Sequence, residues 1–131
     1  MSILGRRVSR KMIAAMTGML LLVALLPALS STPTLQLTLV AKGMAFYLED
    51  DLNTPNPTID VKAGQRVRIV VKNQDRGLVH DLAVPVVRAL TKDLTWNQAG
   101  KVTFTAPKTP GTYEYFCQPH KLMMKGTIRV Y

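Results

Sequence analysis

The period of the apolar residues is the feature that most constrains this fold. From Thr34 onward they recur at every second position, most clearly where Val67, Ile69 and Val71 alternate with basic residues. A period of two puts the apolar side chains on one face of a β-strand, whereas a helix requires spacings of three and four. A chain made of such strands has to pack one sheet against another to bury those faces.

Segments with strand character follow one another at short intervals, separated by turn residues such as Pro55-Asn56-Pro57 and Ala63-Gly64. A short helical turn is expected between Val86 and Leu94. This pattern, without a long amphipathic helix, predicts an all-β Greek-key β-sandwich of about seven to eight strands. The predicted strands are 35–39, 58–61, 66–72, 78–84, 101–105, 112–116 and 126–131.

The beginning of the chain has the charge-then-apolar order of an export signal. Four basic residues within Arg6–Lys11 precede a nearly unbroken apolar run of 18 residues, Met12–Leu29. This length is at the lower limit for crossing a bilayer, so cleavage before Ser31 and retention as a membrane anchor both stay open. The arginine pair in the basic stretch also leaves the twin-arginine export route open beside the general one.

We therefore divide the chain into an export or anchor segment, 1–30, and a domain, 31–131. The domain is expected in the periplasm or on the outer face of the cytoplasmic membrane, with membrane contact only through 1–30 if that segment is retained. The formal net charge is +9, but the domain holds 13 of the 17 basic residues and all 8 acidic ones, which leaves +5. Its basic residues are scattered singly, which predicts a solvated surface and no nucleic-acid partner. Steering toward an acidic protein or an anionic membrane is the alternative.

Cys117 is the single cysteine, so it cannot form a disulfide within the chain. It lies in the segment 115–127 together with His120 and two methionines, in a loop between two predicted strands. Soft sulfur and imidazole donors select copper, and two histidines, one cysteine and a distant methionine form the donor set of an electron-transfer copper site. The one other histidine, His80, lies about 40 residues upstream, after the clearest strand.

These residues resemble the cupredoxins, the small blue copper proteins that include plastocyanin, amicyanin and azurin. The segment Cys117-Gln118-Pro119-His120 is similar to the ligand loop of plastocyanin and amicyanin, and the segment Met124-Lys125-Gly126-Thr127 is similar to the end of the azurin loop. The resemblance covers the whole domain. It implies that one copper ion is bound by four ligands: His80, Cys117, His120 and Met124.

The resemblance also implies roles for the neighbours of the ligands. Met123 competes with Met124 for the axial position and otherwise packs beside the site. The edge of His120 lies nearest solvent and passes the electron through an apolar patch. The candidate members of that patch are Pro119, Leu122, Met123, Met44 and Pro85.

One position departs from the family pattern. Family members commonly have asparagine directly after the upstream histidine, and this chain has Asp81. A carboxylate can accept hydrogen bonds from backbone N–H groups near Cys117, but it cannot donate one. Its negative charge favours Cu(II), so we expect Asp81 to lower the reduction potential.

The resemblance implies an electron carrier with transient redox protein partners, monomeric and not an enzyme. The alternative is a cupredoxin-like module for copper delivery, or for an accessory role in a membrane or iron-uptake system, because such domains share the type of segment found around His80. Copper oxidases and nitrite reductases need further histidines, a binuclear site needs a second cysteine, and methionine is a poor zinc ligand. A metal-free structural sandwich remains a further alternative, which metal content would separate from the others.

Overall fold

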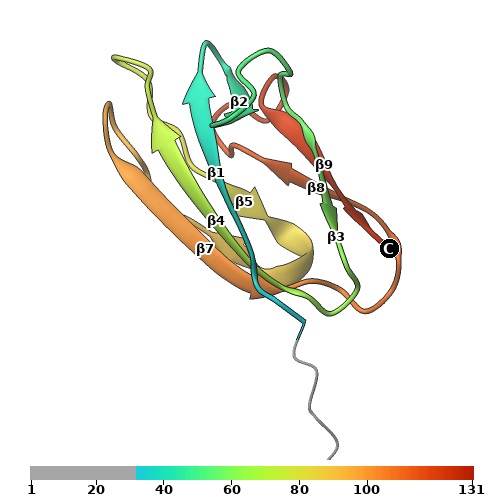
Figure 1. The fold of residues 1–131 in the computed structure, drawn as a ribbon. Helices are drawn as coiled ribbons and strands as arrows, with labels where there is room; N and C mark the ends of the chain where they lie inside the picture. The colour runs from blue at the N-terminus through green and yellow to red at the C-terminus, as the bar shows by residue number, and fades with distance from the viewer. Residues whose placement is uncertain (1–31) are drawn as a thin grey trace, which may run out of the picture. The chain divides into compact units, whose positions relative to one another are not determined.

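The computed structural model describes residues 32–131, which form two β-sheets with a shared core (Figure 1). The predicted export or anchor segment lies outside these residues, so its cleavage and the boundary of the domain stay predictions. Within residues 32–131, no helix is long and apolar enough to cross a membrane.

The first sheet has four strands in the order β2-β1-β4-β7 and the second has five in the order β3-β9-β8-β5-β6. In the first sheet β1 and β4 pair in parallel, and in the second β3 and β9 do the same. The chain therefore crosses between the sheets rather than running up and down within one, as in a Greek-key sandwich. The first sheet comprises β1 (Leu35–Lys42), β2 (Ala45–Leu48), β4 (Arg66–Asn73) and β7 (Ala99–Thr105). The second comprises β3 (Thr58–Val61), β5 (Ala83–Val84), β6 (Ala89–Leu90), β8 (Gly111–Phe116) and β9 (Lys125–Val130).

The predicted all-β sandwich is confirmed, with two more strands in the described part than the alternation indicates. The strand β2 has hydrophobic residues at all four positions and β6 has only two residues, so neither shows a period of two. The predicted strand over 78–84 is only partly strand, because β5 covers its last two residues. Of the segment 86–94, where a helical turn was expected, only the first two residues are helical, in a short 3-10 helix (Pro85–Val87), and β6 follows it.

The core contains the alternating apolar residues that the sequence predicts to lie there. In β4 every second side chain is buried, and Val67, Ile69 and Val71 have no exposed surface. Full burial of an aliphatic side chain stabilises the fold by about 1.5–3 kcal/mol. From the second sheet Tyr115 is fully buried, its hydroxyl donates to the backbone oxygen of Pro57 at 2.7 Å, and its ring packs against Phe46.

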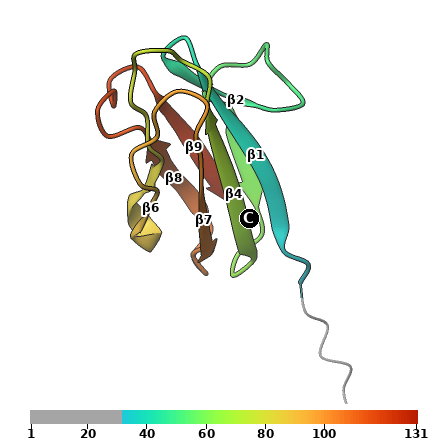
Figure 2. The same cartoon turned by 90° about the vertical axis from the view of Figure 1, so that its left-hand side faces the viewer.

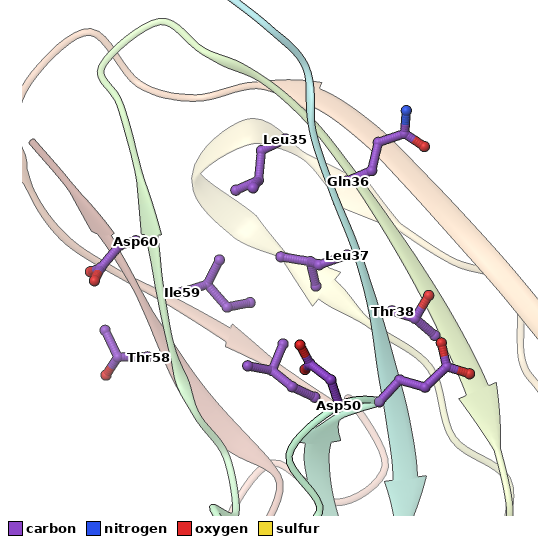
Figure 3. Close-up of a pocket in the computed structure, with 10 residues that line it drawn as sticks. Leu35, Gln36, Leu37, Thr38, Asp50, Thr58, Ile59 and Asp60 are labelled. Atoms are coloured by element: carbon purple, nitrogen blue, oxygen red, sulfur yellow. The ribbon is translucent and has the colours of Figure 1, made fainter.

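The sandwich is open along one side, where β2 pairs with only the last four residues of β1. There Leu35 and Leu37 of β1 and Ile59 of β3 line a groove (Figure 3). No histidine or cysteine lines it. Two of its acidic side chains are already paired, Glu49 with Lys72 and Asp60 with Arg129.

Three loops come together at one end of the β-sandwich (Figure 2). They are the turn 43–44 after β1, the segment 74–82 after β4 and the loop 117–124 between β8 and β9. The N–H of Gly43 donates to the Asp75 carboxylate at 2.8 Å, and the N–H of Gln118 donates to Asp81 at 2.6 Å. The first contact joins the turn 43–44 to the segment 74–82, and the second joins that segment to the loop 117–124, at the end where the predicted ligands lie.

Candidate metal centre

The cysteine loop is closed by its own backbone. The N–H of Cys117 donates to the Met124 carbonyl at 3.0 Å, the N–H of His120 donates to the Cys117 carbonyl, and the N–H of Met124 donates to the His120 carbonyl at 2.8 Å. Cys117 follows the last residue of β8 and has no exposed surface. The compact turn therefore presents Cys117 and His120 together from the end of the second sheet.

His80 lies in the segment between β4 of the first sheet and β5 of the second. Its N–H and carbonyl exchange hydrogen bonds with Leu94 at 3.0 and 2.8 Å, and its side chain is fully buried. The amide of Asn73 supports the segment, since its nitrogen donates to the carbonyls of Leu78 and Leu94, each at 2.8 Å. Asn73 is itself buried, so losing these hydrogen bonds would leave polar groups unpaired away from water. The backbone conformation that positions His80 is therefore fixed.

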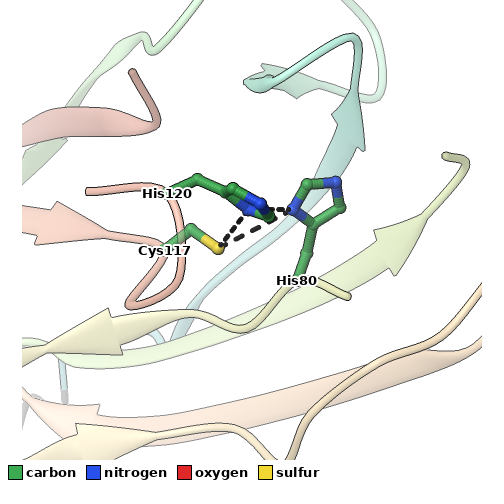
Figure 4. Close-up of side chains that lie close together, drawn as sticks. All are labelled: His80, Cys117 and His120. Carbon is green, nitrogen blue, oxygen red and sulfur yellow. Dashed lines mark hydrogen bonds between the residues drawn. The ribbon is translucent and has the colours of Figure 1, made fainter. Parts of the chain in front are cut away.

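Three donor atoms from these two segments converge (Figure 4). The Cys117 Sγ lies 3.7 Å from the His80 Nδ1 and 3.6 Å from the His120 Nδ1, and the two nitrogens are 3.2 Å apart. An ion about 2.0 Å from each nitrogen and about 2.3 Å from the sulfur in a trigonal plane requires separations of about 3.5 Å and about 3.7 Å. The three residues fit a single metal ion.

A carboxylate faces the other side of the His80 ring. The His80 Nε2 lies 2.9 Å from an Asp75 oxygen, and an ionised carboxylate only accepts hydrogen bonds, so Nε2 carries the proton. In the neutral ring, Nδ1 is then free to bind a metal. Burial raises the pKa of Asp75, but hydrogen bonds from Gly43 and His80 outweigh it and hold that pKa below its ordinary value.

The cysteine is a thiol until a metal displaces its proton. Burial raises the pKa of Cys117 above its ordinary value, and the charge of Asp81 acts in the same direction. Metal binding to this thiol therefore releases a proton. Asp81 is buried, and its acceptance of the Gln118 N–H confirms the expected contact with the cysteine loop.

The two methionines of the loop have opposite environments. Met124 has no exposed surface, whereas the Met123 side chain is 61% exposed and its carbonyl accepts from the Asn56 amide at 2.9 Å. Met124 is thus the methionine inside the sandwich. Met123 lies beside His120 at the rim of the site, where it is largely exposed to solvent.

An apolar groove surrounds the half-buried His120. Its apolar lining residues are Met44, Pro119, Leu122 and Met123, with Gln118 and Lys121 as the polar ones, and the Leu122 side chain is fully exposed. Four of the five patch members predicted from the sequence lie there, and the fifth, Pro85, does not line it.

Sequence reasoning missed two residues that shape the site. Asn73 and Asp75 follow the predicted strand 66–72, and the sequence pattern assigns neither of them a role at the site. The one signal for them is local: an Asn-Gln-Asp run between a strand and a histidine. A run of this kind is common in ordinary turns, so it does not by itself point to a metal site.

Comparison with known proteins agrees with this geometry. A family model described as a cupredoxin-like domain matches residues 13–130. The chloroplastic plastocyanin of Physcomitrium patens is 29% identical over 138 residues, which cover 95% of this chain and 70% of that protein.

Two solved structures share the fold. Rusticyanin from Thiobacillus ferrooxidans is 26% identical with a TM-score of 0.56, over 77% of this chain and 79% of that one. Auracyanin A, a blue copper protein from Chloroflexus aurantiacus, is 23% identical with a TM-score of 0.61, over 76% of this chain and all of that one.

The chain belongs to the cupredoxin family. Its cofactor is copper, because the family and the sulfur and imidazole donors agree.

Proposed function

We propose that this protein is an exported one-electron carrier that uses one copper ion and exchanges electrons with transient protein partners. The ligands are His80, Cys117, His120 and Met124. Copper bound there supplies a one-electron couple between Cu(II) and Cu(I). The observation that carries the proposal is the convergence of Sγ and two Nδ1 atoms at separations of 3.2–3.7 Å.

The loops hold the donor atoms in one arrangement. His80 is fixed through Asn73 and Leu94, and the cysteine loop is fixed through its own hydrogen bonds and through Asp81. A carrier benefits from such a framework, because ligands that move little between oxidation states keep the nuclear rearrangement small. Whether a geometry of this kind is imposed by the protein or inherent in copper–thiolate bonding does not alter what the framework does.

The surface around His120 supports its role as the exit for the electron. His120 reaches from the buried Cys117 Sγ to the groove that holds Leu122 and Met123. Lys121 is the one charged residue that lines this mostly apolar groove, so a partner can approach with little desolvation of charge, and a small contact of this type suits transient association. We therefore propose that the redox partners dock on this groove. Between encounters the protein is proposed to be a monomer.

The same residues argue for a carrier rather than an enzyme. The sequence has two histidines, and both face the one cysteine at this site. A catalytic copper would need ligands of its own and an open position for substrate, as catalytic metals do. We propose that the chain has no catalytic activity of its own.

Copper delivery is the second candidate, and the groove gives one observation in its favour. Met44 and Met123 both line it beside His120, and thioethers are ligands that Cu(I) prefers. A delivery module would release Cu(I) to a competing site quickly. A carrier would keep it through many oxidation cycles.

The test is the visible and EPR spectrum of the protein after one equivalent of Cu(II), with Cys117→Ser as the control. We expect an intense thiolate-to-copper band and narrow copper hyperfine splitting, both lost in the control. A pale spectrum with ordinary splitting would overturn the ligand assignment. Rapid loss of Cu(I) to a competing chelator would favour delivery, and analysis of the N-terminus in isolated cell fractions tests export.

A further inference from the structure

Asp75 links the turn 43–44 to the segment that carries His80, and the functional proposal gives it no role. One carboxylate oxygen accepts the Gly43 N–H at 2.8 Å and the other lies 2.9 Å from the His80 Nε2. Its side chain is 14% exposed, whereas the His80 ring it faces has no exposed surface. The hydrogen bond between the two side chains is therefore weakened by water far less than contacts on the surface are.

The position of Asp75 is itself fixed by neighbouring groups. Its N–H donates to the Asn73 side-chain oxygen at 2.8 Å, and the nitrogen of the same amide holds the carbonyls of Leu78 and Leu94. The carboxylate is thus built into the segment that carries His80. It is not a surface group that reaches inward by chance.

We propose that Asp75 is a positioning residue that locks the His80 ring with Nδ1 toward Cys117 and lowers the reduction potential of the copper site. This inference rests on the proposed function, and it identifies a residue that sets the reduction potential of the copper site. A carboxylate that accepts from the distal N–H of a metal-binding histidine fixes its tautomer and raises the basicity of the other nitrogen. Greater basicity at Nδ1, together with a nearby negative charge, favours Cu(II) over Cu(I).

Two carboxylates then act on the copper site from different sides. Asp81 accepts from the cysteine loop, and Asp75 acts through the imidazole of His80. Asp75 changes the donor strength of a ligand, whereas Asp81 contacts the backbone next to Cys117. Replacing either residue should raise the potential, and only replacement of Asp75 should alter the His80 ring.

The variant to make is Asp75→Asn, which keeps the size, removes the charge and leaves one acceptor oxygen for the three N–H donors of Gly43, Met44 and His80. Asp50→Asn is the matched control, because Asp50 is an exposed acid in the groove between β1 and β3 and the change in net charge is the same. Loss of a group that supports a metal ligand typically changes metal affinity about 10- to 100-fold. If the substitution weakens the binding of Cu(II) and not that of Cu(I), the reduction potential rises by about 59 mV for each tenfold loss of affinity.

The first measurement is the potential of the copper-loaded variants, taken where the blue spectrum shows that the site is assembled. A rise of at least about 59 mV in Asp75→Asn, with little change in Asp50→Asn, supports the inference. Equal potentials in the two variants overturn it and leave the carrier function standing.

The second measurement uses the copper-free protein and does not depend on the carrier function. Nitrogen-15 NMR of the wild-type protein should show a protonated His80 Nε2 whose proton resonates downfield and exchanges slowly with water. In Asp75→Asn that proton should shift upfield. A wild-type His80 protonated at Nδ1, or an Nε2 proton unaffected by the substitution, overturns the inference even if Asp75→Asn folds poorly with copper.

Discussion

Gly126→Ala should destabilise this protein far more than a glycine-to-alanine change in a strand usually does. Gly126 lies opposite Tyr115 in the pairing of β8 with β9, and the Tyr115 ring covers it. A Cβ at position 126 would collide with the Cζ and hydroxyl of that ring. The backbone angles of Gly126 are not in the left-handed region, so the cost is steric rather than conformational.

The Tyr115 ring has nowhere to move. It has no exposed surface, its centroid lies 5.7 Å from that of Phe46, and its hydroxyl is bound to the Pro57 carbonyl at 2.7 Å. Overpacking of a core costs about 1–3 kcal/mol, and a buried carbonyl left without its donor costs about 1–3 kcal/mol more. We therefore expect the free energy of unfolding to fall by about 2–6 kcal/mol, a large part of the roughly 5–15 kcal/mol typical of a domain.

Urea denaturation of the copper-free protein, followed by circular dichroism, measures this loss. Tyr115→Leu provides the matched background, because it removes the ring atoms that the new methyl group would meet. In that background Gly126→Ala should cost less than about 1 kcal/mol, so that the double-mutant cycle shows strong coupling. A similar loss in both backgrounds, or a small loss in the wild-type background, would refute the steric reasoning.

Three further predictions concern the metal centre. Asn73→Ala should lower the free energy of unfolding by about 2–5 kcal/mol, since it leaves buried backbone groups of the His80 segment unpaired; urea denaturation measures this. Asp81→Asn should raise the reduction potential because it removes a buried negative charge beside the cysteine loop, and a fall or no change in voltammetry contradicts this. Removal of copper should lower the melting temperature, since an ion that binds only the folded state at 100 times its dissociation constant adds about 2.7 kcal/mol; equal melting temperatures in calorimetry would show that the ion does not stabilise the fold.

Much of the fold was predictable because strand signals are local. The predicted strand 58–61 is β3 to the residue, and 66–72 is β4 but for its last residue. The partial failure over 78–84 has a tertiary cause. There the backbone leaves the strand conformation expected from its apolar residues, and His80 pairs with Leu94 in an isolated bridge.

The sequence by itself determined the kinds of donor at the candidate site and their order along the chain. Two histidines, one cysteine and a neighbouring methionine are a matter of composition and spacing, and they point to copper through the chemistry of their atoms. An alternating pattern determined the sandwich for an equally local reason, since each side chain's face follows from its position in a strand.

Only the tertiary structure decided which ring nitrogen of His80 faces the cysteine, which methionine is buried and what supports the site. Asp75 meets Gly43 across 32 residues, and Tyr115 reaches Pro57 across 58. Contacts of this range depend on how the sheets pack and where the loops end, and no local pattern encodes them. The donors are therefore visible in the sequence, whereas their orientation and tuning follow from the packing of the two sheets.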